Sequence, residues 1–198
     1  MDALSISAII KTLRATFAEL PDGRTGKNST YTMLDAAAGA FGIFFTQSPS
    51  FLAYQRDMER RKGRNNAASL FGVTEIPSDQ QIRNLLDPVP PSNLFEPFWT
   101  LQKAMEASGH LAQHRGYRDT YLIVLDGTHY FSSQTIQCKN CTVHQHGDQE
   151  RYYHSAITPV LVSPNSKQVY PLPPEFIVPQ DGSEKQDCER GTPYGNDG

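Results

Sequence analysis

One stretch near the middle of the chain, Tyr121 to Ser133, limits what the chain can fold into more than any other. Residues 121–125 are all apolar or aromatic, and Ile123 and Val124 are β-branched. A short continuous apolar run of this kind is typical of a strand that is buried on both faces. It is followed by a carboxylate, Asp126, and then by a glycine that permits a sharp turn. We therefore expect a buried strand that ends at Asp126.

Asp126 has two interpretations. A carboxylate at the end of a central strand is held on rigid backbone and is partly shielded from water, as a divalent-metal ligand in a hydrolytic or phosphoryl-transfer site requires. Asp-Gly is also one of the commonest turn pairs, and a turn needs no function. The local sequence leaves both interpretations open.

The pattern on either side of this stretch predicts an α+β fold. Before it, apolar residues recur at helical spacing from Leu4 to Leu20, where Pro21 to Gly23 ends the helix. Further helices are expected from a Ser29 or Thr30 cap to Phe45, over 51–62, 66–71 and 78–86, and from a Ser92 cap to Gly109. After it, extended segments are expected over 128–137 and 173–179, and an antiparallel hairpin over 152–162 and 167–172.

Length and composition exclude some classes of protein. The chain has 198 residues, enough for one domain or two small ones. No apolar run approaches the roughly 18 residues of a membrane span, and the N-terminus does not have the pattern of a signal peptide. Three cysteines do not form a disulfide framework. We expect a cytoplasmic protein without a membrane partner.

Basic residues are concentrated in the helical part. Residues 1–70 contain nine Lys or Arg against six Asp or Glu, whereas residues 71–198 contain nine against fifteen. The densest basic cluster consists of Arg60, Arg61, Lys62 and Arg64. Cations at a helix C-terminus interact favourably with the helix dipole, and this explains the cluster without a ligand. The same side chains are also suited to contact DNA phosphates without sequence preference.

A second group of residues suggests a metal site. Two cysteines and two histidines lie within nine residues: Cys138, Cys141, His144 and His146. Cys-x-x-Cys is the spacing of zinc knuckles, because a tight turn directs both sulfurs at one ion. The alternative is a flexible loop with reduced thiols and solvated histidines. His129 and His154, in expected strands, are interpreted as structural histidines.

Six stretches form a recognisable set: FTQSPSFLAYQRDM (45–58), GRNN (63–66), LFG (70–72), IPSDQQIRNLLDP (76–88), LDGT (125–128) and QDGSEKQDCE (180–189). Together they resemble the N-terminal half of bacterial insertion-sequence transposases of the DDE type. The resemblance implies a helical region over residues 1–110, a possible DNA-binding part. It also implies a partial RNase H-like catalytic core over 119–190, made of the first strand plus an antiparallel hairpin.

The resemblance further implies an activity, namely DNA transposition by metal-dependent cleavage and joining of DNA strands. In that family three carboxylates hold two divalent ions, Mg²⁺ or Mn²⁺, and the match makes Asp126 the first of the three. The implied partners are transposon-end DNA and further copies of the same chain.

The sequence departs from the family pattern at its C-terminal end. The second Asp and the final Glu of the family are not in this chain, and residues 191–198 do not match. The expectation is a truncated transposase that is inactive alone. The alternatives are a non-catalytic DNA-binding or regulatory fragment and a zinc-bearing interaction module.

Overall fold

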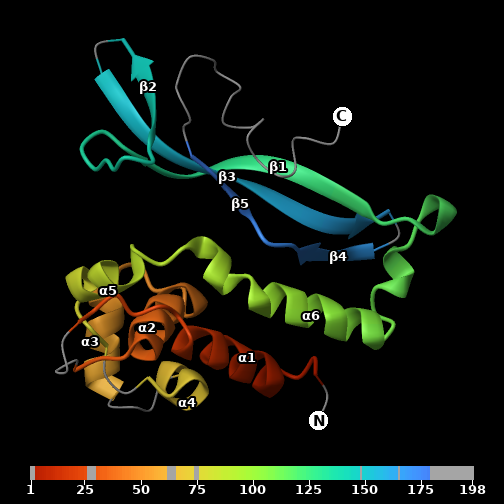
Figure 1. The fold of residues 1–198 in the computed structure, drawn as a ribbon, viewed down its shortest axis with the longest axis horizontal. Helices are drawn as coiled ribbons and strands as arrows, with labels where there is room; N and C mark the ends of the chain where they lie inside the picture. The colour runs from red at the N-terminus through yellow and green to blue at the C-terminus, as the bar shows by residue number, and fades with distance from the viewer. Residues whose placement is uncertain are drawn as a thin grey trace. The chain divides into compact units, whose positions relative to one another are not determined.

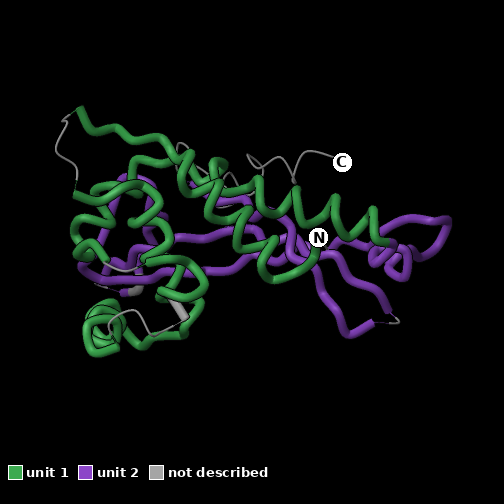
Figure 2. The backbone as a smooth tube through the Cα atoms, turned by 90° about the horizontal axis from the view of Figure 1, so that it is seen from below, with its two compact units in different colours: residues 1–108 green, residues 109–198 purple. Residues whose placement is uncertain are grey.

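The computed structural model describes residues 3–25, 30–61, 66–73, 76–147, 149–164 and 166–178. The chain divides into two compact units, residues 1–108 and residues 109–198, which Figure 2 shows in different colours. Unit 1 is helical and unit 2 contains an antiparallel sheet (Figure 1). The fold class is therefore α+β, as expected from the sequence.

Unit 1 contains six α-helices in its described part: α1 (Ile6–Ala18), α2 (Met33–Phe45), α3 (Phe51–Arg61), α4 (Asn66–Phe71), α5 (Asp79–Leu86) and α6 (Glu96–Ala107). Hydroxyl side chains fix several of the starts. Ser5 accepts a hydrogen bond from the backbone N–H of Ala8, and Ser78 accepts one from Gln81. None of the described helices is both long and apolar enough to cross a bilayer.

Two expected helix starts are wrong. The cap of α2 is Thr32, not Ser29 or Thr30, and it forms a reciprocal capping box with Asp35. Ser92 does not cap the last helix, because residues Pro91–Leu94 form a separate 3₁₀ turn and α6 begins at Glu96. Before α2 several hydroxyl residues lie within a few positions and the local pattern does not choose among them, whereas α6 begins after Phe95 without any side-chain cap.

One hydrophobic cluster holds the helices of unit 1 together. The small residues Ala36, Ala37 and Ala38 on α2 are buried, and they allow neighbouring helices to approach closely. The Phe41 ring of the same helix lies 6.0 Å from Phe17 and 5.3 Å from Phe71, measured between ring centroids. Helix α2 is therefore the centre of this core.

Unit 2 is organised around one long strand. The strands are β1 (Leu122–Ser133), β2 (Thr142–His146), β3 (Gln149–Ser163), β4 (Ser166–Pro171) and β5 (Glu175–Ile177). Strand β3 pairs antiparallel with β1 along one edge and with β2, β5 and β4 in succession along the other. The expected hairpin over 152–162 and 167–172 is confirmed as β3 and β4.

The expectation for β1 is wrong in two respects. The strand does not end at Asp126 but continues to Ser133, so that Asp126 lies opposite Thr158 in the ladder. Its apolar run is not buried, since the exposed fractions of residues 122–125 lie between 43 and 52%. Continuous pairing with β3 overrides the turn propensity of Asp-Gly, and an apolar run alone does not distinguish an edge strand from a central one.

Candidate metal centre

Two cysteines and a histidine from different segments of unit 2 lie together. Cys138 and Cys141 belong to the loop between β1 and β2, and His154 belongs to β3. The Nε2 atom of His154 lies 3.3 Å from the Sγ atom of Cys138 and 3.4 Å from that of Cys141. The two Sγ atoms are 3.8 Å apart and are not joined by a disulfide. The three side chains could hold one metal ion.

These distances agree with three corners of a tetrahedron around zinc. With Zn–S bonds of about 2.3 Å and Zn–N bonds of about 2.05 Å, a tetrahedral site has an S···S edge of about 3.8 Å and S···N edges of about 3.6 Å. The observed S···S separation equals the tetrahedral value. Each observed S···N separation is shorter than its tetrahedral value by at most about 0.3 Å. An ion at the centre therefore requires little movement of the donors.

The cysteine turn directs two backbone N–H groups at the cysteine sulfurs. The backbone N–H of Cys141 donates to the carbonyl of Cys138, which closes a tight turn. Within that turn the N–H of Cys138 donates to the Sγ of Cys141, and the N–H of Asn140 donates to the Sγ of Cys138. Burial raises the pKa of the Cys141 thiol, an effect that the backbone hydrogen bond from Cys138 opposes. A bound cation would favour the thiolate and so oppose the effect of burial.

Aromatic rings surround the histidine. The Tyr130 ring stacks on His154 with centroids 5.8 Å apart, and the Phe131 ring lies 5.6 Å away. Both residues lie where the register of β1 against β3 shifts, between His129 and Phe131. The bulge thus brings two consecutive β1 rings to one β3 side chain.

His144 does not join this group. It lies on β2, and its ring contacts the rings of His129 and Tyr153 at centroid distances of 6.4 and 5.1 Å. Tyr153 precedes His154 on β3, and successive side chains of a strand point to opposite faces. His144 is therefore on the other face of the sheet from His154. The side chain of His146 is outside the described residues.

His154 is the residue that sequence reasoning missed. The sequence analysis interprets it as structural because it lies in an expected strand, where a histidine is more often a structural residue than a functional one. The Gly147-Asp148 pair between two strand-like segments was the available signal, since it predicts a hairpin that returns the chain past the cysteines. Only the register shows that position 154, and not 153, faces them.

Asp126 lies apart from this centre. Its side chain is exposed, and it belongs to no group of three or more ligand side chains in the part of the chain that the structure describes. Thr158, its partner in the ladder, and His154 are four residues apart on β3, so Asp126 and the centre share a face of the sheet at roughly 13 Å. The carboxylate does not contribute to the cysteine–histidine group.

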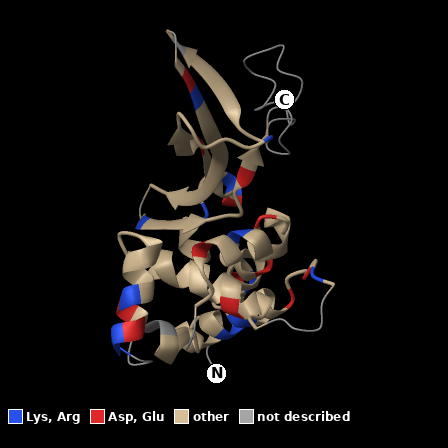
Figure 3. Cartoon of the chain, turned by 90° about the vertical axis from the view of Figure 1, so that its left-hand side faces the viewer, with Lys and Arg blue, Asp and Glu red and all other residues tan. Residues whose placement is uncertain are grey.

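The basic cluster at the end of α3 is only partly described. Arg60 and Arg61 form the last turn of α3, and both are exposed. Arg61 makes an ion pair of 2.9 Å with Asp57 one turn earlier on the same helix. Lys62 and Arg64 lie outside the described residues. Figure 3 shows basic and acidic segments next to one another in the helical unit.

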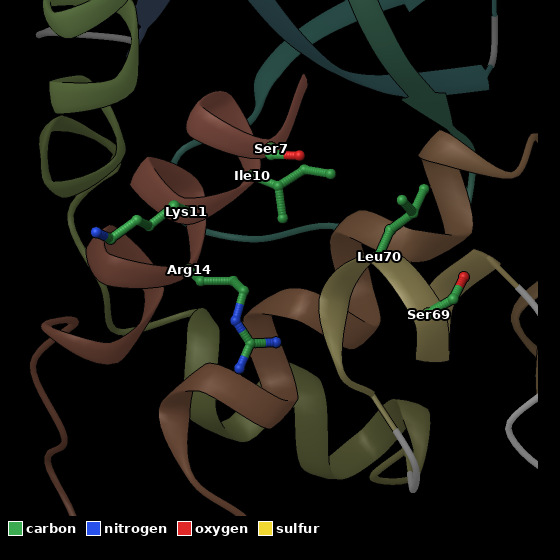
Figure 4. Close-up of a pocket in the computed structure, with 6 residues that line it drawn as sticks. All are labelled: Ser7, Ile10, Lys11, Arg14, Ser69 and Leu70. Atoms are coloured by element: carbon green, nitrogen blue, oxygen red, sulfur yellow. The ribbon is translucent and has the colours of Figure 1, made fainter. Parts of the chain in front are cut away.

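A pocket in unit 1 adds cations that the sequence did not single out. It has a volume of about 360 Å³ and lies between α1 and α4 (Figure 4). Its lining consists of Ser7, Ile10, Lys11, Arg14, Ser69 and Leu70. Lys11 and Arg14 are one helical turn apart, and neither makes an ion pair with a described acidic side chain. Figure 4 shows the Lys11 side chain extending away from Ser69 and Leu70, so the two cations suit separate contacts with phosphate groups and not one shared anion.

Comparison with protein-family models, with curated proteins and with solved structures finds no match for this chain.

Proposed function

We propose that the chain is a transposase-type protein of the DDE class, whose lineage cleaves and joins DNA strands with divalent metal ions. One observation carries the structural part of the proposal. The strand with Asp126 pairs antiparallel with β3, which in turn pairs antiparallel with β4. This is the strand-plus-hairpin order that the sequence resemblance implies for the start of an RNase H-like core.

The described residues do not complete a two-ion site. Two ions need several carboxylates, and Asp126 is not clustered with other ligand side chains in the described ranges. In the proposal Asp126 supplies one ligand to Mg²⁺ or Mn²⁺, and the chain alone does not transpose DNA.

The catalytic part is tested with Asp126→Ala. We expect no Asp126-dependent nicking of transposon-end DNA by the chain alone with Mg²⁺ or Mn²⁺. If the chain nicks DNA and Asp126→Ala nicks it equally well, Asp126 is not the metal ligand. If the chain nicks DNA and Asp126→Ala abolishes the nicking, Asp126 is needed for cleavage, and the proposal that the chain alone is inactive is wrong.

Non-catalytic DNA binding is the second candidate function, and the cations of unit 1 favour it. Lys11 and Arg14 line a pocket, and Arg60 is an exposed cation at the end of α3. Phosphate contacts would hold DNA in a salt-dependent manner, as a regulatory fragment that occupies transposon ends requires.

The binding test is a gel shift with transposon-end DNA over a range of salt concentrations. Lys11→Ala combined with Arg14→Ala should weaken binding uniformly across sequences and reduce the salt slope by about 2, because each phosphate contact contributes about 1. Lys103→Ala combined with Arg83→Ala removes two exposed charges, on α6 and α5, and is the matched control. No shift at low salt would exclude DNA binding.

We also propose that the ion of the Cys138, Cys141 and His154 group is zinc. Thiolate and imidazole donors favour zinc over Mg²⁺ or Mn²⁺, which prefer oxygen ligands. Metal analysis of the chain purified under reducing conditions should give about one zinc per chain. A metal-free chain that also fails to take up added zinc would disprove the assignment.

A further inference from the structure

We infer that zinc at Cys138, Cys141 and His154 sets the register of the β2–β3 hairpin, so that this end of the sheet folds together with its ion. The inference rests on the proposed zinc assignment and adds a role for the ion.

Little apolar burial holds this end of the sheet in place. Within residues 134–147, Cys141 is the one described residue that is buried. On the other side of the hairpin, residues 149–151 are exposed and residues 152–154 are half-buried. The hydrophobic cluster formed by described buried residues consists of residues of unit 1. Strand β1 pairs with β3 only as far as Tyr152, and β2 pairs in the described sheet with β3 alone, so a cross-link would stabilise this end of the sheet.

The proposed ion supplies that cross-link next to the first pair of the ladder. Thr142 lies opposite Tyr153. Cys141 immediately precedes Thr142, and His154 immediately follows Tyr153, so the ion joins the two strands where their pairing begins. Every ligand comes from outside the turn, and the ion therefore closes the whole hairpin.

The ion also selects one register over its neighbours. A slip of one residue moves every side chain of a strand to the opposite face. Such a slip would place Tyr153 on the cysteine side and move His154 away. Phenol is a poor substitute for imidazole as a zinc ligand, so only the observed pairing retains three donors. Zinc therefore stabilises the observed register and none of the slipped ones.

The effect extends to β1 through the aromatic rings. Tyr130 and Phe131 contact the His154 ring at the bulge. On the opposite face His129 and Ser155 form a hydrogen bond of 2.6 Å between Nδ1 and Oγ. An ion that fixes His154 also fixes the ring against which this bulge packs.

Amide hydrogen exchange of the full chain, with zinc bound and after removal of zinc by a chelator, tests the inference. Without zinc, the amides of residues 142–146 and 149–154 should exchange about tenfold faster or more, since their local opening is no longer linked to metal binding. Amides of α1 and α2 should not change. Zinc bound with unchanged exchange of the hairpin would overturn the inference and leave the zinc assignment intact.

Two matched variants test the ligand set. His154→Ala should lose the zinc and the thiolate-to-metal absorption of the cobalt-substituted chain, whereas His144→Ala should retain both. Fluorescence of Trp99 in α6 verifies that unit 1 is folded in each variant. Loss of zinc in His144→Ala with retention in His154→Ala would overturn the ligand set. Absence of zinc from the unchanged chain would disprove the zinc assignment itself.

Discussion

The packing of Tyr54 against Gly42 shows how tightly single residues are fitted in unit 1. Tyr54 on α3 is 3% exposed, and its hydroxyl has no hydrogen-bond partner among the described residues. Burial raises the pKa of this hydroxyl and keeps it neutral. A Cβ atom at position 42 on α2 would overlap the Tyr54 hydroxyl oxygen. Glycine is therefore required there by the approach of a neighbouring helix.

Gly42→Ala is expected to destabilise the chain. Overpacking costs about 1–3 kcal/mol, which exceeds the roughly 0.5–1 kcal/mol that alanine gains over glycine inside a helix. Urea unfolding followed by Trp99 fluorescence measures the net loss. Gly23→Ala is the control, because a Cβ at position 23 contacts nothing within 4 Å. The cost should shrink in the Tyr54→Phe background, and an equal cost in both backgrounds would contradict the explanation.

Among the elements, β1 differs most from its sequence expectation. It pairs with β3 and with no other strand in the described part of the sheet, so one row of its backbone groups is unpaired there. Val124 and Leu125 on this strand are 43 and 47% exposed. An apolar edge strand with free backbone groups is a site for pairing with another chain.

Val124→Lys should reduce self-association of the chain. A charge on an edge strand opposes edge-to-edge pairing because it would be buried in the new contact. Light scattering at increasing protein concentration measures the effect. Leu52→Lys on α3 is the matched control, since Leu52 is 54% exposed but lies on a helix. Equal reduction by both variants would show that general solubility, not the strand edge, is responsible.

At the level of the molecule, the helical unit is stabilised by burial of apolar side chains, and the sheet unit by strand pairing and the proposed metal ion. Unit 1 has a cluster of buried apolar side chains, and the proposed metal site lies entirely in unit 2. The sole tryptophan of the chain, Trp99, belongs to α6 of unit 1. The two kinds of stabilisation can therefore be separated by spectroscopy.

Chelation by EDTA should leave the unfolding midpoint of unit 1 unchanged, as followed by Trp99 fluorescence, because no proposed zinc ligand lies in that unit. The same treatment should lower the unfolding midpoint of unit 2, since the zinc binds only the folded hairpin. Near-ultraviolet circular dichroism in the tyrosine region follows it, because seven of the nine tyrosines belong to unit 2, and a Tyr31→Phe/Tyr54→Phe background removes the other two. A shift of the Trp99 midpoint equal to that of the tyrosine signal would contradict this separation.

The sequence by itself determined most of the elements and their type. Apolar spacing and hydroxyl caps predicted the helices, because these signals act within a few residues along the chain. Strand-like composition and a turn predicted the β3–β4 hairpin for the same reason. Cys-x-x-Cys predicted half of the metal centre, since two sulfurs on one tight turn need no distant partner.

The tertiary structure alone decided three things. It placed Asp126 within a strand and not at its end, because pairing with β3 outweighs the local turn preference. It left the apolar run of β1 exposed. Burial depends on which other segments pack against a strand, and the sequence of the strand itself does not specify them. It also brought His154, and not His144, to the cysteines. Strand register assigns side chains to faces, and a ladder between distant residues sets that register.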